Sequence, residues 1–421
     1  MDEVHVVTAF LRQGPDVLLV RRSDAVGTYP GAWGGVSGYA EANPDDQVRV
    51  EIREETGFDA ADRTFVRAGD PVTIDDTLPD GTRRRWVVHP YLFDVAARDV
   101  TPNEELATTT WLPPTAIHDP GRDTVPGLWT AYDRVRPTLE TVRDDHDHGS
   151  AWLSLRALDV LRDEAALSSD PTEVTAVARA LLDARPDMVV LRNRVNRAMA
   201  DATDAGDWTP DDVATTATET ARTAASADTT AAMNAAPLLD GATVATHSRS
   251  GTVEDALSRA DPDGVVLSEA RPGREGVTVA ESFASTGLDV TITSDANLPT
   301  AATGCDLVLV GADAVTPAGA LVNKVGTRSL ARCATDADRP VYVVCAADKV
   351  APGPITPTEQ APPDALYDGA ADVEIENPRF DMTPASDLDG IVTEAGLLTA
   401  DDVRARATVH RQLADWTQHV D

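Results

Sequence analysis

The sequence predicts an α/β protein with two domains, and three observations support this. The chain has 421 residues, which is too many for one ordinary domain. Residues 1–143 alternate short apolar runs with turns around one well-marked helix, which indicates a mixed α/β domain. From residue 241 onward, short Val-rich runs alternate with stretches of helical length, a pattern typical of a parallel sheet covered on both faces.

The elements of the first domain follow from periodicity and from turn residues. In chain order they are strands at 3–13 and 16–23, a glycine-rich loop at 27–38, a helix at 43–58, strands at 83–95 and 107–114, and a closing helix at 127–143. The first helix carries the clearest signals, because Asn43 is a favoured N-cap, Pro44 suits the first turn and Gly57 suits the end.

The polar, aperiodic segment 144–150 marks the domain boundary, so the domains are expected at 1–143 and 149–421. The second domain is divided into a helical subdomain at 149–238, a parallel-sheet subdomain at 239–400 and a C-terminal helix at 401–421. Helices are expected at 151–167, 171–202 and 209–235, the last because this Ala- and Thr-rich stretch has neither proline nor glycine beyond its first turn. A disordered segment of low complexity is the alternative for the last stretch.

The sheet of the second domain predicts where a ligand binds. Its expected strands lie at 242–248, 264–270, 288–295, 306–313 and 340–346. Ligands bind at the carboxyl ends of strands in such sheets. The loops to examine therefore begin at His247, Glu269, Ser294 and Gly311.

Composition excludes several classes of function. The net charge is −34, and the excess of aspartate is spread along the chain, which argues against nucleic acid or anionic membranes as partners. A carboxylate-rich surface with almost no lysine resembles proteins of extreme halophiles. No apolar run is long enough to span a membrane. The three cysteines lack metal-ligand spacing and are expected to be buried thiols in a cytoplasmic protein.

The helix at 43–58 carries a candidate metal site. Glu51, Glu54 and Glu55 fall at i, i+3 and i+4, which places three carboxylates on one helical face. Such carboxylates repel one another unless a cation lies among them, and Mg²⁺ prefers carboxylate and phosphate oxygens. In so acidic a chain, a solvated helix face is the alternative interpretation.

The residues around these glutamates resemble the Nudix box of the Nudix pyrophosphohydrolases. The matching positions are Gly35, Glu41, Arg49, Glu51, Glu54, Glu55 and Gly57. Val50 stands where the box has arginine, so Arg49 lies one place early. The resemblance covers about residues 1–143 and implies a Nudix α/β sandwich. It also implies a catalytic Mg²⁺ or Mn²⁺ held by the three glutamates, with Glu41 as a further contact.

A second candidate site surrounds Lys324, one of only two lysines among the 36 basic residues. Asp313 ends an expected buried strand, and Lys324 follows in a glycine-rich stretch where its ammonium suits a phosphate. A structural Asp313–Lys324 ion pair is the alternative. His247 is expected either to contact a ligand or to be a hydrogen-bonded structural residue.

Several segments in order resemble the superfamily of initiation factor 2B alpha-type subunits, methylthioribose-1-phosphate isomerases and ribose-1,5-bisphosphate isomerases. They are "ARPDMVVLRN", "THSRSG", "SEARPGREG", "SDANL", "GADAVTPAGALVNKVGT" and "VTEAG". The resemblance runs from about residue 149 to 396. It implies a helical subdomain before a Rossmann-like sheet, a homodimer or higher oligomer, and a pocket for a phosphosugar or nucleotide. The implied contacts are Arg185, His247, Ser248, Arg271, Asn323 and Lys324, with Asp313 as a catalytic group.

Three departures from this family bear on catalysis. The family cysteine is Ser248, a much weaker acid than a thiol. The family's Arg-Gly phosphate contact reads His148-Gly149, and a family glutamine is Glu275. The leading expectation is therefore a Mg²⁺-dependent Nudix hydrolase of a nucleoside diphosphate derivative, fused to a phosphosugar- or nucleotide-binding domain. The alternatives are a non-catalytic sensor related to initiation factor 2B and a ribose-1,5-bisphosphate-type isomerase.

Overall fold

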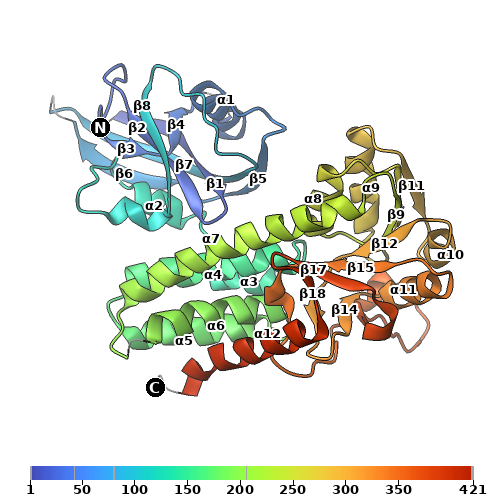
Figure 1. Cartoon of the computed structure of the whole chain (residues 1–421). Helices are drawn as coiled ribbons and strands as arrows, with labels where there is room; N and C mark the ends of the chain where they lie inside the picture. Colours follow the sequence, from blue (N-terminus) through green and yellow to red (C-terminus); the bar gives the residue numbers. More distant parts are fainter. Residues whose placement is uncertain (1, 42, 79–80, 205, 419–421) are drawn as a thin grey trace. The chain divides into compact units, whose positions relative to one another are not determined.

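The structure is a computed structural model that describes residues 2–41, 43–78, 81–204 and 206–418 (Figure 1). The chain forms two compact units, residues 1–138 and 139–421. No helix in the described ranges is both long and apolar enough to cross a membrane.

The first unit is a mixed sheet between two helical layers. Its strands are β1 (Asp2–Gln13), β2 (Asp16–Arg22), β3 (Trp33–Gly34), β4 (Val36–Tyr39), β5 (Arg63–Ala68), β6 (Val72–Thr77), β7 (Arg83–Val95) and β8 (Leu106–Leu112). The core order is β3-β2-β1-β7-β5, with β1 and β7 parallel. The expectation of a loop at 27–38 is partly wrong, because β3 lies within this stretch and β4, which pairs with β1, begins in it.

Alternation along β1 and β2 gives each face of this sheet its own core. Val7 and Leu11 pack with Ile52 of α1 (Pro44–Thr56), whereas Phe10 packs with Tyr132 of α2 (Leu128–Asp133). This confirms the α/β sandwich expected from the sequence, because successive side chains of a strand point to opposite faces.

Helix α1 begins and ends as the sequence predicts. The Asn43 side chain accepts a hydrogen bond from the backbone N–H of Asp45 at 3.1 Å, and Pro44 follows in the first turn. Gly57 has φ = 79° and donates its N–H to the carbonyl oxygen of Arg53, a left-handed end that glycine adopts without strain. These caps fix the direction in which the acidic face of α1 points.

Two expected helices are each interrupted near a proline. The helix expected at 127–143 is wrong as a single element: α2 ends before Pro137, and α3 (Leu139–Asp144) belongs to the second unit, where it packs against α4 (Ser150–Leu167) and α5 (Pro171–Ala184). The stretch 171–202 likewise forms two helices, because the residue before Pro186 cannot stay helical. The break leaves Arg185, with φ = −138° and ψ = 70°, at the end of α5.

The second unit begins with a helical part and continues into a sheet. The helices of this part are α4 (Ser150–Leu167), α5 (Pro171–Ala184), α6 (Val189–Thr203) and α7 (Pro210–Ala235), and α12 (Ala400–Leu413) packs against α6 (Figure 1). The Ala- and Thr-rich stretch is thus the long helix α7. The C-terminal helix expected at 401–421 packs within its own chain but ends at Leu413, and residues 419–421 of that expectation lie outside the described residues.

The sheet has the strand order β11-β10-β9-β12-β15-β17-β18, and all of its pairs are parallel except the last. Its strands are β9 (Thr243–Thr246), β10 (Gly264–Ser268), β11 (Val290–Thr293), β12 (Leu307–Val310), β15 (Val341–Val344), β17 (Gly390–Thr393) and β18 (Gly396–Leu398). This confirms the expected parallel sheet. The order reverses between β9 and β12, and such a switch point is where doubly wound sheets bind ligands.

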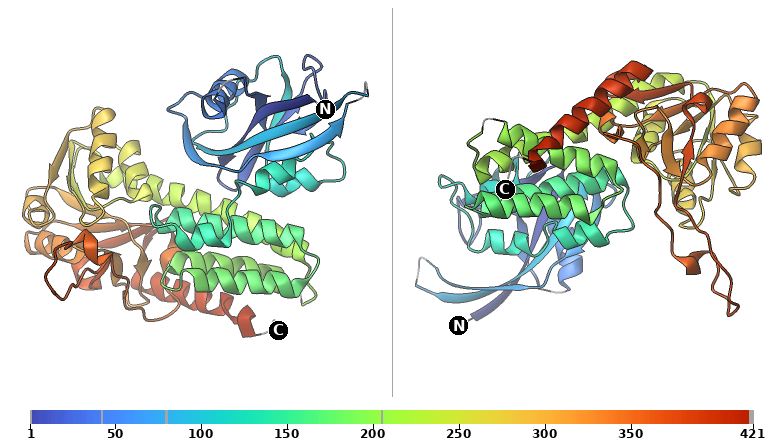
Figure 2. Two further views of the ribbon diagram at one scale, coloured as in Figure 1. Left: turned by 180° about the vertical axis from the view of Figure 1, so that it is seen from behind. Right: turned by 90° about the horizontal axis from the view of Figure 1, so that it is seen from below.

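Helices cover both faces of this sheet (Figure 2). Val244 and Leu309 pack with α7, α8 (Gly251–Arg259) and α9 (Glu275–Ser285) on one face. Ala245 and Val308 pack with α10 (Leu298–Ala302), α11 (Thr327–Asp336) and α12 on the other. A smaller antiparallel sheet of β13 (Ala314–Val315), β14 (Leu321–Lys324) and β16 (Phe380–Thr383) extends from the carboxyl end of β12.

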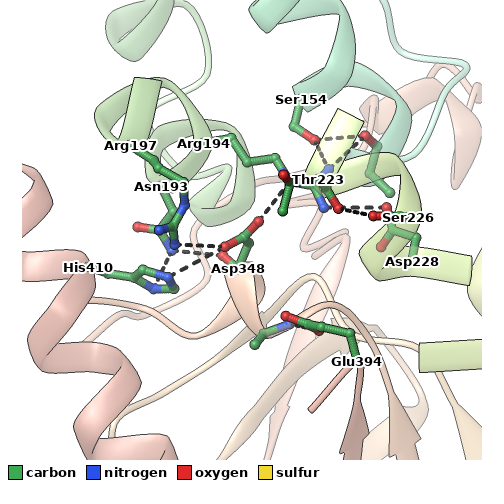
Figure 3. A network of polar contacts seen from close by, with 12 residues as sticks. Ser154, Asn193, Arg194, Arg197, Thr223, Ser226, Asp228, Asp348, Glu394 and His410 are labelled. Atoms are coloured by element: carbon green, nitrogen blue, oxygen red, sulfur yellow. Dashed lines mark hydrogen bonds and ion pairs between the residues drawn. The ribbon is translucent and has the colours of Figure 1, made fainter. Parts of the chain in front are cut away.

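A buried polar network joins the helical part to the sheet (Figure 3). Asp348, from the short helix η3 (Ala347–Lys349), contacts Arg194 at 3.2 Å, Arg197 at 3.3 Å and His410 at 3.6 Å. Burial would raise the pKa of Asp348, but the His410 hydrogen bond and the two guanidinium groups outweigh it and hold that pKa well below its usual range. Asp348 is therefore ionised and ties α6 and α12 to the sheet.

Candidate functional sites

The acidic face of α1 lies against β4 at one edge of a cavity. Glu51 accepts a hydrogen bond from Gln47 Nε2 at 2.7 Å. Glu55 is only 3% exposed, and its Oε1 is 3.3 Å from the backbone N–H of Ser37, which donates to it. A Cβ atom at Gly38 would lie 2.0 Å from the Glu51 carboxyl group, so the absence of a side chain there makes room for Glu51.

The electrostatics of these two carboxylates are unfavourable without a cation. Burial, with a contribution from Glu51, raises the pKa of Glu55 to about 8. Burial also raises the pKa of Glu51, and the charges of Glu54 and Glu105 add to the effect. A divalent ion would offset both the repulsion and the loss of hydration.

The full set of expected metal ligands does not meet at one point. Within the described ranges, no three His, Cys, Asp or Glu side chains are arranged to hold one ion. Glu54 is exposed, whereas Glu55 is buried beneath β4, so the shared helical face does not bring them together here. The donor chemistry of Glu51 and Glu55 nevertheless suits Mg²⁺, because both offer carboxylate oxygens. A bound cation would lower the raised pKa values of the two side chains.

A cavity of about 430 Å³ opens beside Glu51 and is lined also by Glu41 and Glu105. Its aromatic wall holds Tyr29 and Trp86, whose ring centroids are 6.0 Å apart. The sequence did not single out Gln47, Glu105 or this wall. Gln47 stands at i−4 from Glu51, which is a usable signal, but nothing in the spacing brings the start of β8 next to α1.

The raised pKa of Glu55 predicts a pH-dependent stability. An unfolded glutamate loses its proton near its ordinary pKa, whereas folded Glu55 keeps it until about pH 8, so stability is lost as pH rises through this window. We expect the free energy of unfolding of the metal-free wild type to fall by about 3 kcal/mol relative to that of Glu55→Gln between about pH 5 and about pH 7. Thermal and urea unfolding at a series of pH values measure this difference. Parallel pH profiles for the two proteins would contradict this assignment.

The second site is a cavity of about 570 Å³ at the carboxyl ends of the central strands. Its lining includes six of the residues expected from the sequence: Arg185, His247, Ser248, Asp313, Asn323 and Lys324. Residues 359, 361, 362 and 365 also line it, from the long loop between β15 and β16 that the sequence did not mark. An adjoining cavity of about 670 Å³ shares Ser150, Arg185 and Asp313.

Arg271 is the one expected contact that lies outside this lining. Its side chain is 60% exposed, and its Nε is 3.5 Å from Glu269 Oε2. Pro272, Gly273 and Arg274 line the cavity in its place. The sequence of this loop does not show which of its residues lie against the cavity.

His247 is held firmly by its neighbours. It is 4% exposed, with Nε2 2.8 Å from the carbonyl oxygen of Val325 and Nδ1 2.8 Å from Ser268 Oγ. Burial lowers the pKa of His247, which favours the neutral ring. These contacts fit the structural alternative, although the ring also forms part of the cavity wall.

Lys324 forms its ion pair with Glu275 rather than with Asp313. Its Nζ lies 2.6 Å from Glu275 Oε1, and the Ser248 hydroxyl donates to the same oxygen at 2.9 Å. The alternative interpretation, a structural Asp313–Lys324 ion pair, is therefore wrong. Glu275 begins α9, a position that the sequence identified only as a departure from a family pattern.

Asp313 lies where an acid–base group would be placed. The Ser150 hydroxyl donates to its Oδ1 at 3.3 Å. Burial raises the pKa of Asp313, and the positive charge of Lys349 partly offsets this. Lys349, the second lysine of the chain, donates from Nζ to the carbonyl oxygen of Ala312. Lys324 therefore lines the cavity, whereas Lys349 acts on Asp313 through its charge.

Arg185 and Asn323 complete the expected set. The guanidinium of Arg185 donates to the carbonyl oxygens of Val142, at 3.0 Å, and Asp145. Asn323 is buried, and its Nδ2 donates to Thr327 Oγ1 at 3.1 Å. The cavity thus combines cationic groups, an acid of raised pKa and hydroxyl donors, which suits a small phosphorylated molecule.

Comparisons with known proteins agree with this division. The model of the initiation factor 2 subunit family matches residues 146–400, and that of the NUDIX domain matches residues 2–135. A ribose 1,5-bisphosphate isomerase of Archaeoglobus fulgidus is 29% identical over 284 residues, which is 63% of this chain and 90% of that protein. A ribose 1,5-bisphosphate isomerase of Haloferax volcanii is 30% identical over 290 residues, which is again 63% of this chain and 90% of that protein.

A solved structure has the same fold in the second unit. The translation initiation factor eIF-2B of Pyrococcus horikoshii is 26% identical with a TM-score of 0.55, covering 62% of this chain and 94% of its own. The family match extends over more than half of the chain, from residue 146 to 400. The chain therefore belongs to the initiation factor 2 subunit family, and it carries a NUDIX domain fused ahead of that region.

Proposed function

We propose that residues 2–135 hydrolyse a nucleoside diphosphate derivative with Mg²⁺ or Mn²⁺, and that residues 146–400 bind a phosphorylated sugar or nucleotide. The observation that carries the first part is the pair Glu51 and Glu55. Their raised pKa values, next to a cavity with an aromatic wall, are what a cation-dependent site would require. Assembly as a homodimer or larger homo-oligomer remains part of the proposal.

The first site suits attack of water on a diphosphate. Glu51 and Glu55 would hold the metal, with Glu41 or Glu105 as a further donor on the cavity wall, whereas the exposed Glu54 does not join them in this structure. When bound, the ion polarises the diphosphate and makes a water more acidic. As a ligand, Glu55 would give up the proton that its metal-free pKa of about 8 lets it keep, and whichever of Glu41 and Glu105 does not hold the ion would accept the proton of the attacking water. The bond between one phosphorus and the bridging oxygen breaks, which leaves two phosphate monoesters.

The aromatic wall would hold the rest of the substrate. Trp86 Nε1 donates to the Tyr29 hydroxyl at 2.8 Å, and that hydroxyl donates to Asp76 at 2.7 Å. The two rings are thereby fixed and offer flat apolar surface beside the carboxylates. Cleavage of a nucleoside diphosphate sugar would yield a sugar phosphate, the class of ligand proposed for the second unit.

A panel of nucleoside diphosphate derivatives, with ADP-ribose first, tests this function in concentrated KCl with Mg²⁺ or Mn²⁺. We expect metal-dependent release of a nucleoside monophosphate from at least one member. The complete absence of turnover with either metal would favour the alternative, a sensor related to initiation factor 2B that binds without catalysis.

An isomerase is the second candidate, and Asp313 favours it. A buried acid of raised pKa in a cavity can move a proton between sugar carbons, and two relatives are named ribose 1,5-bisphosphate isomerases. Conversion of ribose 1,5-bisphosphate by wild type, with loss of activity in Asp313→Asn, would support it. Without conversion by wild type, this candidate falls.

A further inference from the structure

The Lys324 end of the second cavity already contains an anion, the protein's own Glu275. Lys324 Nζ and the Ser248 hydroxyl both donate to Glu275 Oε1, at 2.6 and 2.9 Å. Both side chains of the ion pair are mostly buried, being 12% and 21% exposed. Little solvent therefore screens the attraction between them.

The backbone adds to this arrangement. Glu275 is the first residue of α9, an eleven-residue helix whose N-terminus favours negative charge. A Cβ at Gly273 would lie 2.5 Å from Glu275 Oε2, so the carboxylate lies directly over a glycine that lines the cavity. Ser248, with φ = 66°, holds a left-handed conformation that a residue with a side chain seldom adopts, and it directs its hydroxyl to Glu275.

The electrostatic balance shows that this carboxylate is ionised. Burial opposes ionisation, but the hydrogen bond and charge of Lys324 outweigh it, so the pKa of Glu275 lies below its ordinary value. An incoming phosphate would meet a fixed negative charge where Lys324 could otherwise bind it. Arg185 differs, since its guanidinium donates to two carbonyl oxygens, which carry no net charge.

We propose that Glu275 determines the specificity of this cavity by excluding a phosphate from the Lys324 end. The cavity then takes a sugar with a single phosphate, held on the Arg185 side, while Glu275 and Ser248 face uncharged hydroxyl groups of the sugar. A sugar carrying phosphates at both ends is disfavoured. This inference rests on the proposed binding of a phosphosugar by residues 146–400.

Titration calorimetry of the full chain with inorganic phosphate and with ribose 5-phosphate tests the inference. Glu275→Gln should bind inorganic phosphate at least tenfold more tightly than wild type, because it frees Lys324 and removes the competing charge. The double variant Glu275→Gln, Lys324→Gln should lose that gain. The matched control is Glu281→Gln, which removes the same charge from an exposed position of α9 and should produce no gain.

The results separate the inference from the proposed function. Equal phosphate affinity in Glu275→Gln and wild type, or an equal gain in Glu281→Gln, would overturn the role of Glu275. If Glu275→Gln shows no cooperative thermal transition, Glu275→Ser carries the same expectation. Failure of wild type to bind ribose 5-phosphate would remove the phosphosugar function, whereas the gain of phosphate binding in Glu275→Gln would still support the exclusion.

Discussion

Replacing Glu51 by glutamine is expected to reduce metal-dependent hydrolysis by at least about 10²-fold, the scale on which groups acting directly in a transition state contribute. The amide keeps the volume of the side chain and its contact with Gln47 but removes the charge that a cation needs. Initial rates on the best substrate of the panel, at saturating Mg²⁺, measure the effect.

The melting temperature of Glu51→Gln distinguishes a loss of hydrolytic activity from a loss of folding. Because burial raises the pKa of Glu51, its ionised form is a cost to the folded state, and Glu51→Gln should melt no lower than wild type. Asp46→Asn is the matched control, because Asp46 is exposed in the first turn of the same helix. Comparable rates for Glu51→Gln and wild type would remove Glu51 from the mechanism.

Replacing Asp348 by alanine is expected to destabilise the protein by about 3–5 kcal/mol, because it leaves a buried guanidinium without its main counter-charge. Arg194 is 0% exposed and, among the residues that the structure describes, would keep only the Asp228 carboxylate, at 3.4 Å, as an ion-pair partner. Chemical denaturation followed by circular dichroism measures the loss.

The control for Asp348→Ala is Asp255→Ala, which breaks the partly exposed ion pair between Asp255 and Arg259 in the same unit. Such a pair is worth about 1 kcal/mol or less. If both variants lose the same stability, the network in Figure 3 does not hold α6 and α12 to the sheet. The network also bears on the second site, since Asp348 and Lys349 are neighbours on η3.

Local sequence signals were enough to predict much of the fold. The caps of α1 depend on Asn43 and Gly57 alone, so short-range chemistry determines them. The Val-rich runs predicted the parallel sheet, and the rule that ligands bind at carboxyl ends placed His247 and Asp313 at one cavity. In both cases, the residues that predict the element belong to that element or lie directly beside it in the sequence.

Contacts between distant segments were not predictable. Glu275 and Lys324 are 49 positions apart, and only the fold, which brings the start of α9 next to Lys324, makes them partners in place of Asp313. The same holds for Glu105 near Glu51 and for the loop residues that wall the second cavity. The rarity of lysine was nevertheless informative, since Lys324 lines that cavity and the charge of Lys349 acts on Asp313 within it.

Calorimetric titration of Mg²⁺ into the full chain, with a non-hydrolysable diphosphate analogue present, tests the central claim most directly. The account predicts saturable binding with proton release near neutral pH, because Glu55 must give up its proton, and loss of that binding in Glu51→Gln. No Mg²⁺ or Mn²⁺ uptake, or uptake unchanged in Glu51→Gln, would contradict it.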